Sequence, residues 1–468
     1  MIVLKKLSYI HWLRASLSSL LCVLVLAIIV NVVIDPFFQY HKPLNDLSYA
    51  YEDVMYQSAG IIKNFDYETL IVGSSLIQNM RPSYVEKKLG TKAIKIPLCG
   101  MSFSYILQAC NIALNYNPKL KIIIMNIDPT VLYNDNIDTS FPEYLYDDNI
   151  FNDINYLLNK NVLLEKNMKI INRTIHGEKE ETLDEAFSSE KTFYFSEYSA
   201  IQSFSLQPID YNEKELQQLY EQSVEQLLNL VNNNSKVKFY FVIPPKSVLD
   251  LYTMNLNGYL DFYCDLITET FEIFERFDNC TFFMFQDEIE IISNLYNYCD
   301  TQHFSSVVSD KIVFDIANGN NELTKVNYRS RIANIKSITQ NFDYSIFSSN
   351  NIPLKDCGDL NDYKDLLKDN RYVYAVKYVG TSASSNISEG VYCAGEKYVS
   401  DDITFDFSDD NTIKKDGVVY SYGLEGINYV VYDRKLGRII DSVRFDFTTG
   451  KAYERLSNRK KDTDKKGS

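Results

Sequence analysis

The sequence contains few of the residues from which metal and nucleic-acid sites are built. Its eight cysteines form no CxxC pair and no other metal-like spacing, so we expect no zinc site, and nothing indicates another metal or a cofactor. Lys and Arg number 47 against 62 Asp and Glu, a formal net charge of −15. Because phosphate binding needs clustered Lys and Arg, and the body of the chain has no basic stripe, we expect no nucleic-acid partner.

Charged residues are also absent from one long stretch near the N-terminus. The run ASLSSLLCVLVLAIIVNVVI occupies residues 15–34, and about 20 residues suffice to cross a bilayer core as a helix. Basic residues within 1–14 precede it and Asp35 follows it, so the positive-inside rule places 1–14 in the cytoplasm and the chain after Asp35 outside. A cleaved signal peptide is the alternative, but the run is long for one and no small-x-small site follows. We therefore expect a single-pass membrane anchor, followed by a linker at 35–49.

The whole chain has 468 residues, so the part that follows the linker is long enough for two folded domains. Segments with strand character alternate with helix-like segments over residues 50–325, which predicts an α/β domain with a five-stranded parallel sheet and right-handed crossovers. A stretch at about 135–210 does not fit this alternation, so we expect an insertion near the carboxyl ends of the strands, where pockets of such sheets lie. The five strand candidates are 70–72, 93–100, 119–128, 236–245 and 280–286.

The pattern changes near residue 330, where short alternating segments are separated by Gly, Asp and Asn turns. We expect a β-rich α+β domain at 326–455 and a charged, disordered tail at 456–468. Cys357 and Cys393 fall in this part, and the sequence is compatible either with a disulfide between them or with two reduced thiols. The strand candidates are 371–380, 400–407, 417–422, 426–433 and 439–447.

Two short motifs at opposite ends of the α/β alternation are typical of nucleophilic catalysis. The first strand candidate ends in VGSSL, where Ser74 and Ser75 either cap the next helix or present a nucleophile. A serine hydroxyl needs a base to take its proton, and the usual base is a histidine steered by an acid. The chain has only four histidines, and His303 alone follows a strand candidate directly, with Asp300 three residues before it.

In this order the motifs resemble the SGNH/GDSL hydrolase superfamily, in particular its membrane-anchored members similar to the D-alanyl-lipoteichoic acid transfer and polysaccharide O-acetylation proteins. The resemblance implies a three-layer α/β/α flavodoxin-like domain. It also implies that Ser75 is the nucleophile, with Ser74 as the runner-up, that His303 is the base, and that Asp300 orients His303.

The resemblance further implies an oxyanion hole. Backbone N–H groups of Ser75 and of Gly100, in LCGMS, would point at the developing negative charge. The superfamily's third block usually supplies an Asn in a Gly-x-Asn-Asp context, but this chain has MNIDP instead. Either Asn126 or Asp128 could line the site there, and we take Asn126 as the third candidate donor.

The segment EGINYVVYDRKLGRIIDSVRFDF resembles the interleukin-like EMT inducer domain. Some relatives of that domain bind sugars, so the resemblance implies carbohydrate recognition, whereas the plainer alternative is a spacer or docking domain. The positions that carry the resemblance are Gly426, Asn428, Asp433, Gly437, Phe445 and Asp446.

Together these features predict a membrane-anchored extracytoplasmic serine esterase or acyltransferase that acts on O-acyl groups of a cell-envelope polysaccharide. Its expected partners are the glycan, the membrane and a multi-pass membrane acyltransferase that delivers the acyl donor. One alternative is a catalytically inactive SGNH scaffold with a carbohydrate-binding C-terminal domain. Another is a thioesterase or lipase that acts on lipids at the membrane surface.

Overall fold

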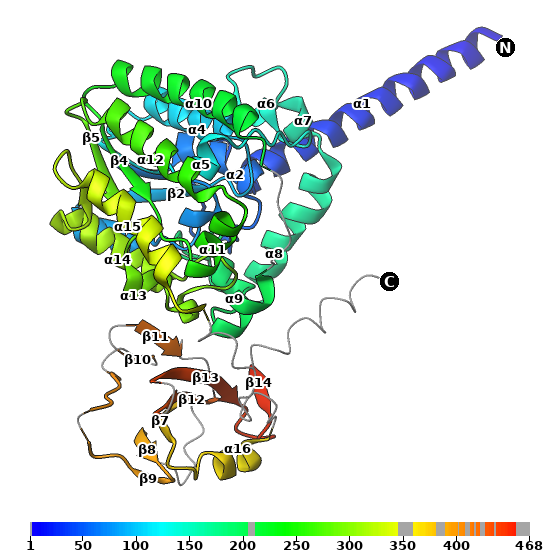
Figure 1. The fold of residues 1–468 in the computed structure, drawn as a ribbon. Coiled ribbons are helices and arrows are strands. Elements are labelled where there is room, and N and C mark those ends of the chain that lie inside the picture. Colours follow the sequence, from blue (N-terminus) through cyan, green and yellow to red (C-terminus); the bar gives the residue numbers. More distant parts are fainter. Residues whose placement is uncertain are drawn as a thin grey trace.

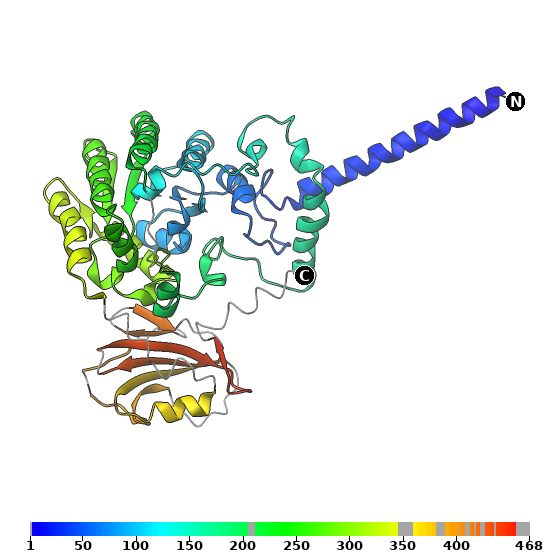
Figure 2. The same ribbon diagram turned by 45° about the vertical axis from the view of Figure 1, so that its right-hand side comes forward.

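The structure is a computed structural model of a mixed α/β protein with a long N-terminal helix and a separate antiparallel sheet (Figures 1 and 2). In both views the antiparallel sheet lies on the side of the α/β unit away from the free end of the N-terminal helix. The described residues are 2–204, 211–344, 359–380, 389–400, 402–407, 412–415, 418–421, 426–434 and 437–454.

The N-terminal helix α1, Ile2–Ile34, projects from the α/β unit (Figure 2). Its segment Tyr9–Ile34 is long and apolar enough to cross a membrane, and most of it is exposed rather than packed in a core. The expected anchor at residues 15–34 lies within this segment. The last turn differs from the rest because Asn31 and Ile34 are buried against the α/β unit.

The central sheet of the α/β unit has six strands in the order β2-β1-β3-β4-β5-β6. The first five pair in parallel, as the apolar runs predict, and β1, β2 and β3 are buried along their whole length. The sixth strand pairs antiparallel with β5, so the sheet is mixed and not purely parallel as expected. The strands are β1 (Thr69–Gly73), β2 (Ala93–Pro97), β3 (Ile122–Asn126), β4 (Lys238–Ile243), β5 (Cys280–Met284) and β6 (Glu322–Leu323).

Helices pack against this sheet and against one another, and their buried side chains belong to the same hydrophobic core as those of the strands (Figure 1). Helix α4 contacts α2 and α10, α12 contacts α10, α11 and α15, and α3 contacts α14. Ile332 and Ile335 of α15 belong to this core, whereas the sequence places the end of the domain at residue 325. The helices are α2 (Val54–Asn64), α3 (Pro82–Leu89), α4 (Phe103–Tyr116), α10 (Glu213–Asn233), α11 (Val248–Leu256), α12 (Leu260–Phe274), α13 (Ile289–Ile292), α14 (Ser306–Asn318) and α15 (Tyr328–Asn341).

Between β3 and β4 the chain makes a long excursion that contains no strand in its described part. It packs onto the same core through buried side chains such as Tyr156 and Ile170. The short elements are α5 (Pro129–Leu132), α6 (Glu143–Tyr146), α7 (Ile154–Leu157), η2 (Val162–Lys166), α8 (Asn167–Ile175), η3 (Ser189–Lys191) and α9 (Glu197–Ser203).

The C-terminal unit contains a six-stranded antiparallel sheet in the order β14-β13-β12-β7-β8-β9 and a separate hairpin, β10-β11. The described residues of the expected strand at 400–407 form no strand, and among them only Asp406 makes an isolated bridge, to Lys414. Cys393 carries a free thiol, while Cys357 and the tail at 456–468 lie outside the described residues. The elements are α16 (Leu360–Leu366), β7 (Tyr372–Val379), β8 (Gly390–Cys393), β9 (Glu396–Lys397), β10 (Ile413–Lys415), β11 (Val418–Ser421), β12 (Gly426–Asp433), β13 (Arg438–Phe445) and β14 (Ala452–Glu454).

An aromatic side chain of the α/β unit contacts the C-terminal unit. Tyr296, in the short turn η4 (Leu295–Asn297) of the α/β unit, packs in a small hydrophobic cluster with Ile413, Val430 and Ile439 of the C-terminal unit. This turn immediately precedes the loop that carries Asp300 and His303.

Candidate active site

The turn after β1 presents Ser75 at the carboxyl end of the sheet. Gly73 ends the strand, and Ser75 begins the short helical turn η1, Ser75–Ile77. A Cβ atom on Gly73 would lie 1.7 Å from Oδ1 of Asn126, so only glycine lets the amide of Asn126 approach the backbone here. The shape of this turn therefore depends on Gly73, which has no Cβ, and on Asn126 at the end of the neighbouring strand β3.

Ser75, His303 and Asp300 form one hydrogen-bonded chain, although 228 positions separate the serine from the histidine. The distance from Oγ of Ser75 to Nε2 of His303 is 2.7 Å, and Nδ1 of His303 lies 2.6 Å from Oδ2 of Asp300. The histidine can thus accept the serine proton on one ring nitrogen while the other donates to the carboxylate. The structure brings together all three residues that the sequence nominates.

The loop that carries Asp300 and His303 is closed on itself. The N–H of Cys299 donates to the carbonyl of His303 at 3.0 Å, and Tyr298 and Phe304 form an antiparallel bridge. Oδ1 of Asp300 accepts the backbone N–H groups of Gln302 and His303, both at 2.7 Å. Burial opposes ionisation of Asp300, but these hydrogen bonds and the imidazole together outweigh it and lower the pKa of the carboxyl. A carboxylate is therefore held in place to orient the histidine.

The runner-up nucleophile, Ser74, faces a different partner. Its backbone N–H donates to Oδ1 of Asn126 at 2.9 Å, and its hydroxyl accepts from Nδ2 of Asn126 at 3.1 Å. The hydroxyl also caps η1 by accepting the N–H of Leu76. Ser74 thus occupies the capping role, whereas the hydroxyl of Ser75 points at the histidine.

Of the three expected oxyanion donors, Ser75 and Gly100 lie in the turns after β1 and β2, and Asn126 is the last residue of β3. In the described part of the chain, the backbone N–H groups of Ser75 and Gly100 donate to no protein acceptor. Gly100 has a positive φ of 69°, and its carbonyl accepts from Asn136 at 2.8 Å, which fixes the turn after β2. Asn126 gives one amide hydrogen to Ser74. Asp128, the alternative to Asn126, instead caps α5 and accepts from Tyr263, so it serves the packing of that region.

Asn79 connects the serine turn to the histidine loop, and the sequence interpretation did not single it out. Its buried amide donates 2.8 Å hydrogen bonds to the carbonyl of Phe304 and to the hydroxyl of Ser189. Its Oδ1 accepts the N–H of Ser189 and the hydroxyl of Ser188, both at 3.0 Å. The one available signal is an asparagine within the stretch LIQNM, one turn after Ser75.

A buried charge cluster of Lys246, Asp128 and Asp250 supports the loop that carries His303, and the sequence interpretation missed it as well. The Nζ of Lys246 is fully buried, 3.7 Å from Asp128 and 3.6 Å from Asp250. Oδ1 of Asp250 accepts from the side-chain amide of Gln302 at 2.9 Å, next to His303. The signal in the sequence is a lysine directly after an apolar strand, in VIPPKS.

A second buried lysine, Lys95 of β2, lies beneath the serine turn. Its Nζ donates to the carbonyl of Gln78 at 2.7 Å and to that of Asp184 at 3.2 Å. Burial lowers the pKa of Lys95 to about 7 against the opposing pull of nearby carboxylates. This lysine therefore caps the end of η1 and ties it to the excursion.

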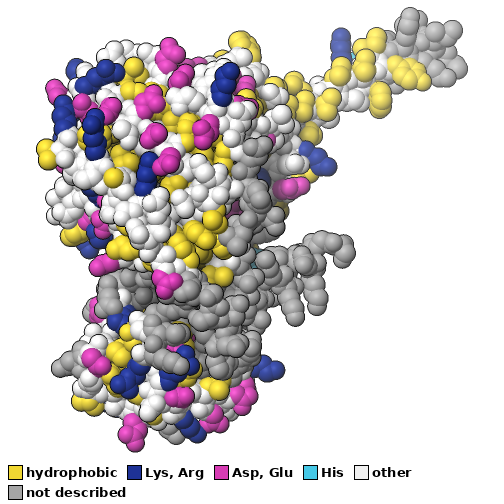
Figure 3. Space-filling model, viewed as in Figure 1, with side chains coloured by type: hydrophobic (Ala, Val, Ile, Leu, Met, Phe, Trp, Pro, Cys, Tyr) yellow, Lys and Arg dark blue, Asp and Glu magenta, His cyan; other side chains and the backbone are white. Residues whose placement is uncertain are grey.

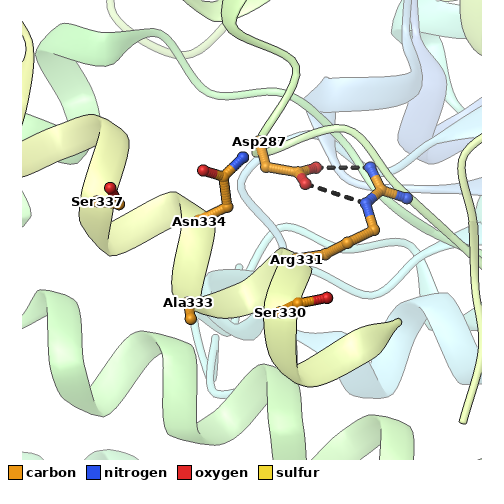
Figure 4. A pocket seen from close by; sticks show the side chains of 6 residues that line it. All are labelled: Asp287, Ser330, Arg331, Ala333, Asn334 and Ser337. Carbon is orange, nitrogen blue, oxygen red and sulfur yellow. Dashed lines mark hydrogen bonds and ion pairs between the residues drawn. The ribbon is translucent and has the colours of Figure 1, made fainter. Parts of the chain in front are cut away.

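The described residues contain no group of His, Cys, Asp and Glu side chains that could hold a metal. A surface pocket lies beside α15 and contains none of the predicted site residues (Figure 4). Its Arg331 pairs with Asp287 and also donates to backbone carbonyls, so its charge is already matched.

The comparisons with known proteins give no independent assignment. No family model matches this chain, and no curated protein matches it.

Proposed function

We propose that this protein is a membrane-anchored serine esterase or acyltransferase of the SGNH/GDSL type. The observation that carries the proposal is the hydrogen-bonded chain from Ser75 through His303 to Asp300. Ser75 lies in the turn after β1, and Asp300 and His303 lie in the connection that follows β5, in the loop between η4 and α14. Connections that follow the parallel strands are where open α/β sheets place their sites. The strand order 2-1-3-4-5 among the parallel strands supports a flavodoxin-like three-layer fold for this domain.

In the proposed reaction, Oγ of Ser75 attacks the carbonyl carbon of an ester while Nε2 of His303 takes the hydroxyl proton. The backbone N–H groups of Ser75 and Gly100 stabilise the oxyanion, an effect worth about 3 kcal/mol per donor. The ester C–O bond then breaks, and His303 returns its proton to the departing alcohol. Water or an acceptor hydroxyl next attacks the acyl-serine, with His303 again taking and returning one proton, so that Ser75 is regenerated.

The proposed substrate is an O-acylated envelope polysaccharide outside the membrane. The N-terminal helix supports membrane anchoring, and the basic residues before it support a cytoplasmic N-terminus and an extracytoplasmic catalytic domain. In this arrangement a multi-pass acyltransferase would supply the acyl group. The C-terminal unit would contribute glycan binding beside the catalytic domain, as its resemblance to the interleukin-like EMT inducer domain implies.

The test uses the full chain in detergent micelles with nitrophenyl acetate and an active-serine phosphonate probe. Ser75→Ala should abolish labelling and lower kcat by about 10⁴-fold or more, because it removes the attacking oxygen. Ser74→Ala should keep labelling at Ser75 and retain measurable activity, because that hydroxyl caps η1 and pairs with Asn126 but makes no hydrogen bond to His303. Labelling at Ser74 would reverse the assignment of the nucleophile.

An unlabelled wild-type chain that binds polysaccharide would favour the inactive scaffold with a glycan-binding C-terminal domain. A preference for long acyl esters over acetate would favour the thioesterase or lipase alternative. Serine labelling, polysaccharide binding and the preferred acyl-chain length together separate the three functions.

A further inference from the structure

The base of α1 is locked into the α/β unit by buried polar groups. Nδ2 of Asn31 donates to the carbonyl of Leu157 at 2.8 Å, and Oδ1 of Asn31 accepts from Asn167 at 2.5 Å. The carboxylate of Asp35, just after the helix, accepts the hydroxyl of Tyr156 at 2.7 Å and three backbone N–H groups. These contacts fix the direction in which α1 leaves the unit, so the unit has one fixed orientation relative to α1.

The length of α1 places this base at the outer boundary of a bilayer. From Trp12, an aromatic residue of the kind found at membrane interfaces, to Asn31 the helix rises about 30 Å, the thickness of a hydrocarbon core. The apolar side chains of Ile29 and Val33 remain exposed, while Asn31 between them is covered by the excursion. The residues that cover Asn31 therefore lie at the depth where headgroups meet acyl chains.

Those covering segments expose large apolar side chains. Phe151, shortly before α7, is 85% exposed, and further exposed residues lie before α7, in α7, in η2 and in α8. Figure 1 shows α7 beside the point where α1 leaves the unit, and Figure 3 shows hydrophobic side chains running along α1 toward that base. We call this set the apolar patch; it comprises Ile150, Phe151, Ile154, Leu164 and Met168.

We infer that the apolar patch inserts into the outer interface of the bilayer that α1 crosses, so that the catalytic unit rests on the membrane in a fixed orientation. This inference rests on the proposed anchoring by α1. Two features favour lipid over a protein partner: the elements that carry the patch, α7, η2 and α8, all contact α1, and the patch lies at the depth of Asn31, to which α7 and α8 hydrogen-bond. An interfacial segment of this kind binds by burying apolar side chains at the boundary between headgroups and acyl chains.

The single tryptophan of the chain, Trp12, makes a direct test possible. The full chain is reconstituted into phosphatidylcholine vesicles whose acyl chains are brominated, because bromine quenches only tryptophans that reach the chains. The wild type reports on Trp12, the double variant Trp12→Phe/Phe151→Trp on the patch, and Trp12→Phe/Val326→Trp on a control site. Val326 is 95% exposed and lies between β6 and α15, away from α1.

We expect the tryptophan at 151 to be quenched to about the same extent as Trp12, and the one at 326 to keep its emission. Trp12→Phe/Ile154→Trp provides a second reporter within the patch. Quenching of Trp12 without quenching at 151 and 154 would overturn the inference and leave the anchoring intact. An unquenched Trp12 would overturn both.

Discussion

Removal of the Asn79 side chain tests whether the distance between Ser75 and His303 depends on one buried amide. Asn79→Ala deletes the side-chain hydrogen bonds that join the serine turn to the carbonyl of Phe304 and to the Ser188–Ser189 backbone and hydroxyls. Because Phe304 directly follows His303, the variant frees the histidine loop from the turn that carries the nucleophile.

The size of the effect follows from the groups that lose their partners. The carbonyl of Phe304 and the N–H of Ser189 are left buried and unpaired, and each costs about 1–3 kcal/mol of stability. The Ser75–His303 hydrogen bond is 2.7 Å long, and a displacement of about 1 Å costs about 10²-fold in rate. We expect Asn79→Ala to lose about 2–5 kcal/mol of stability and up to about 10²-fold in kcat.

The assay is steady-state hydrolysis of nitrophenyl acetate by the full chain, with thermal unfolding measured in parallel. Asn117→Ala is the matched control: Nδ2 of Asn117 donates to the carbonyl of Tyr67 at 2.8 Å, at the amino end of the sheet. It should lower the unfolding temperature without lowering kcat. If Asn79→Ala loses stability but keeps its kcat, or if both variants lose kcat alike, Asn79 does not position the catalytic groups.

Three further predictions concern other parts of the site. Asp300→Asn should lower kcat by about 10⁴-fold, as measured by ester hydrolysis, because the amide no longer holds His303 in the required tautomer. Burial lowers the pKa of Lys95 from 10.5 to about 7, so the folded chain binds fewer protons than the unfolded chain between these values. Chemical denaturation should therefore show wild-type stability, relative to Lys95→Met, rising by about 1.4 kcal/mol per pH unit between pH 7 and 10.5. Gly73→Ala should displace the amide of Asn126 and destabilise the chain by about 2–4 kcal/mol in thermal unfolding.

The parallel strands could be predicted because each is a short apolar run between turn residues, but the antiparallel edge could not. Glu322 and Leu323 form a two-residue strand only because Phe282 and Phe283 of β5 offer free edge groups. Conversely, the alternating segment at 400–407 makes only one isolated bridge. An alternating pattern of apolar and polar residues indicates that a segment fits a sheet. Whether the segment pairs depends on the strand that lies beside it.

Within the site, Asp300 and His303 could be predicted because both lie in one short motif. The residues alone do not decide whether Ser74 or Ser75 is the nucleophile. The choice depends on Asn126, which hydrogen-bonds to Ser74 from 52 positions away in the sequence, because its strand β3 lies beside β1 in the sheet. Asn79 was missed because its partners lie more than 100 positions away. Support of a site by distant backbone carbonyls leaves no local pattern in the sequence.

Because Tyr296 packs against the C-terminal unit, a loss of activity after truncation of that unit does not by itself indicate a role in substrate binding. Tyr296 lies four residues before Asp300 and packs against Val430 and Ile439. Loss of that unit would leave the ring without its cover and would loosen the start of the histidine loop, whose closure depends on the bridge between Tyr298 and Phe304. Lower activity after truncation is thus expected even when the substrate makes no contact with the C-terminal unit. A role in glycan binding would show instead as a higher KM, at unchanged kcat, when exposed side chains of that unit outside the Tyr296 cluster are replaced.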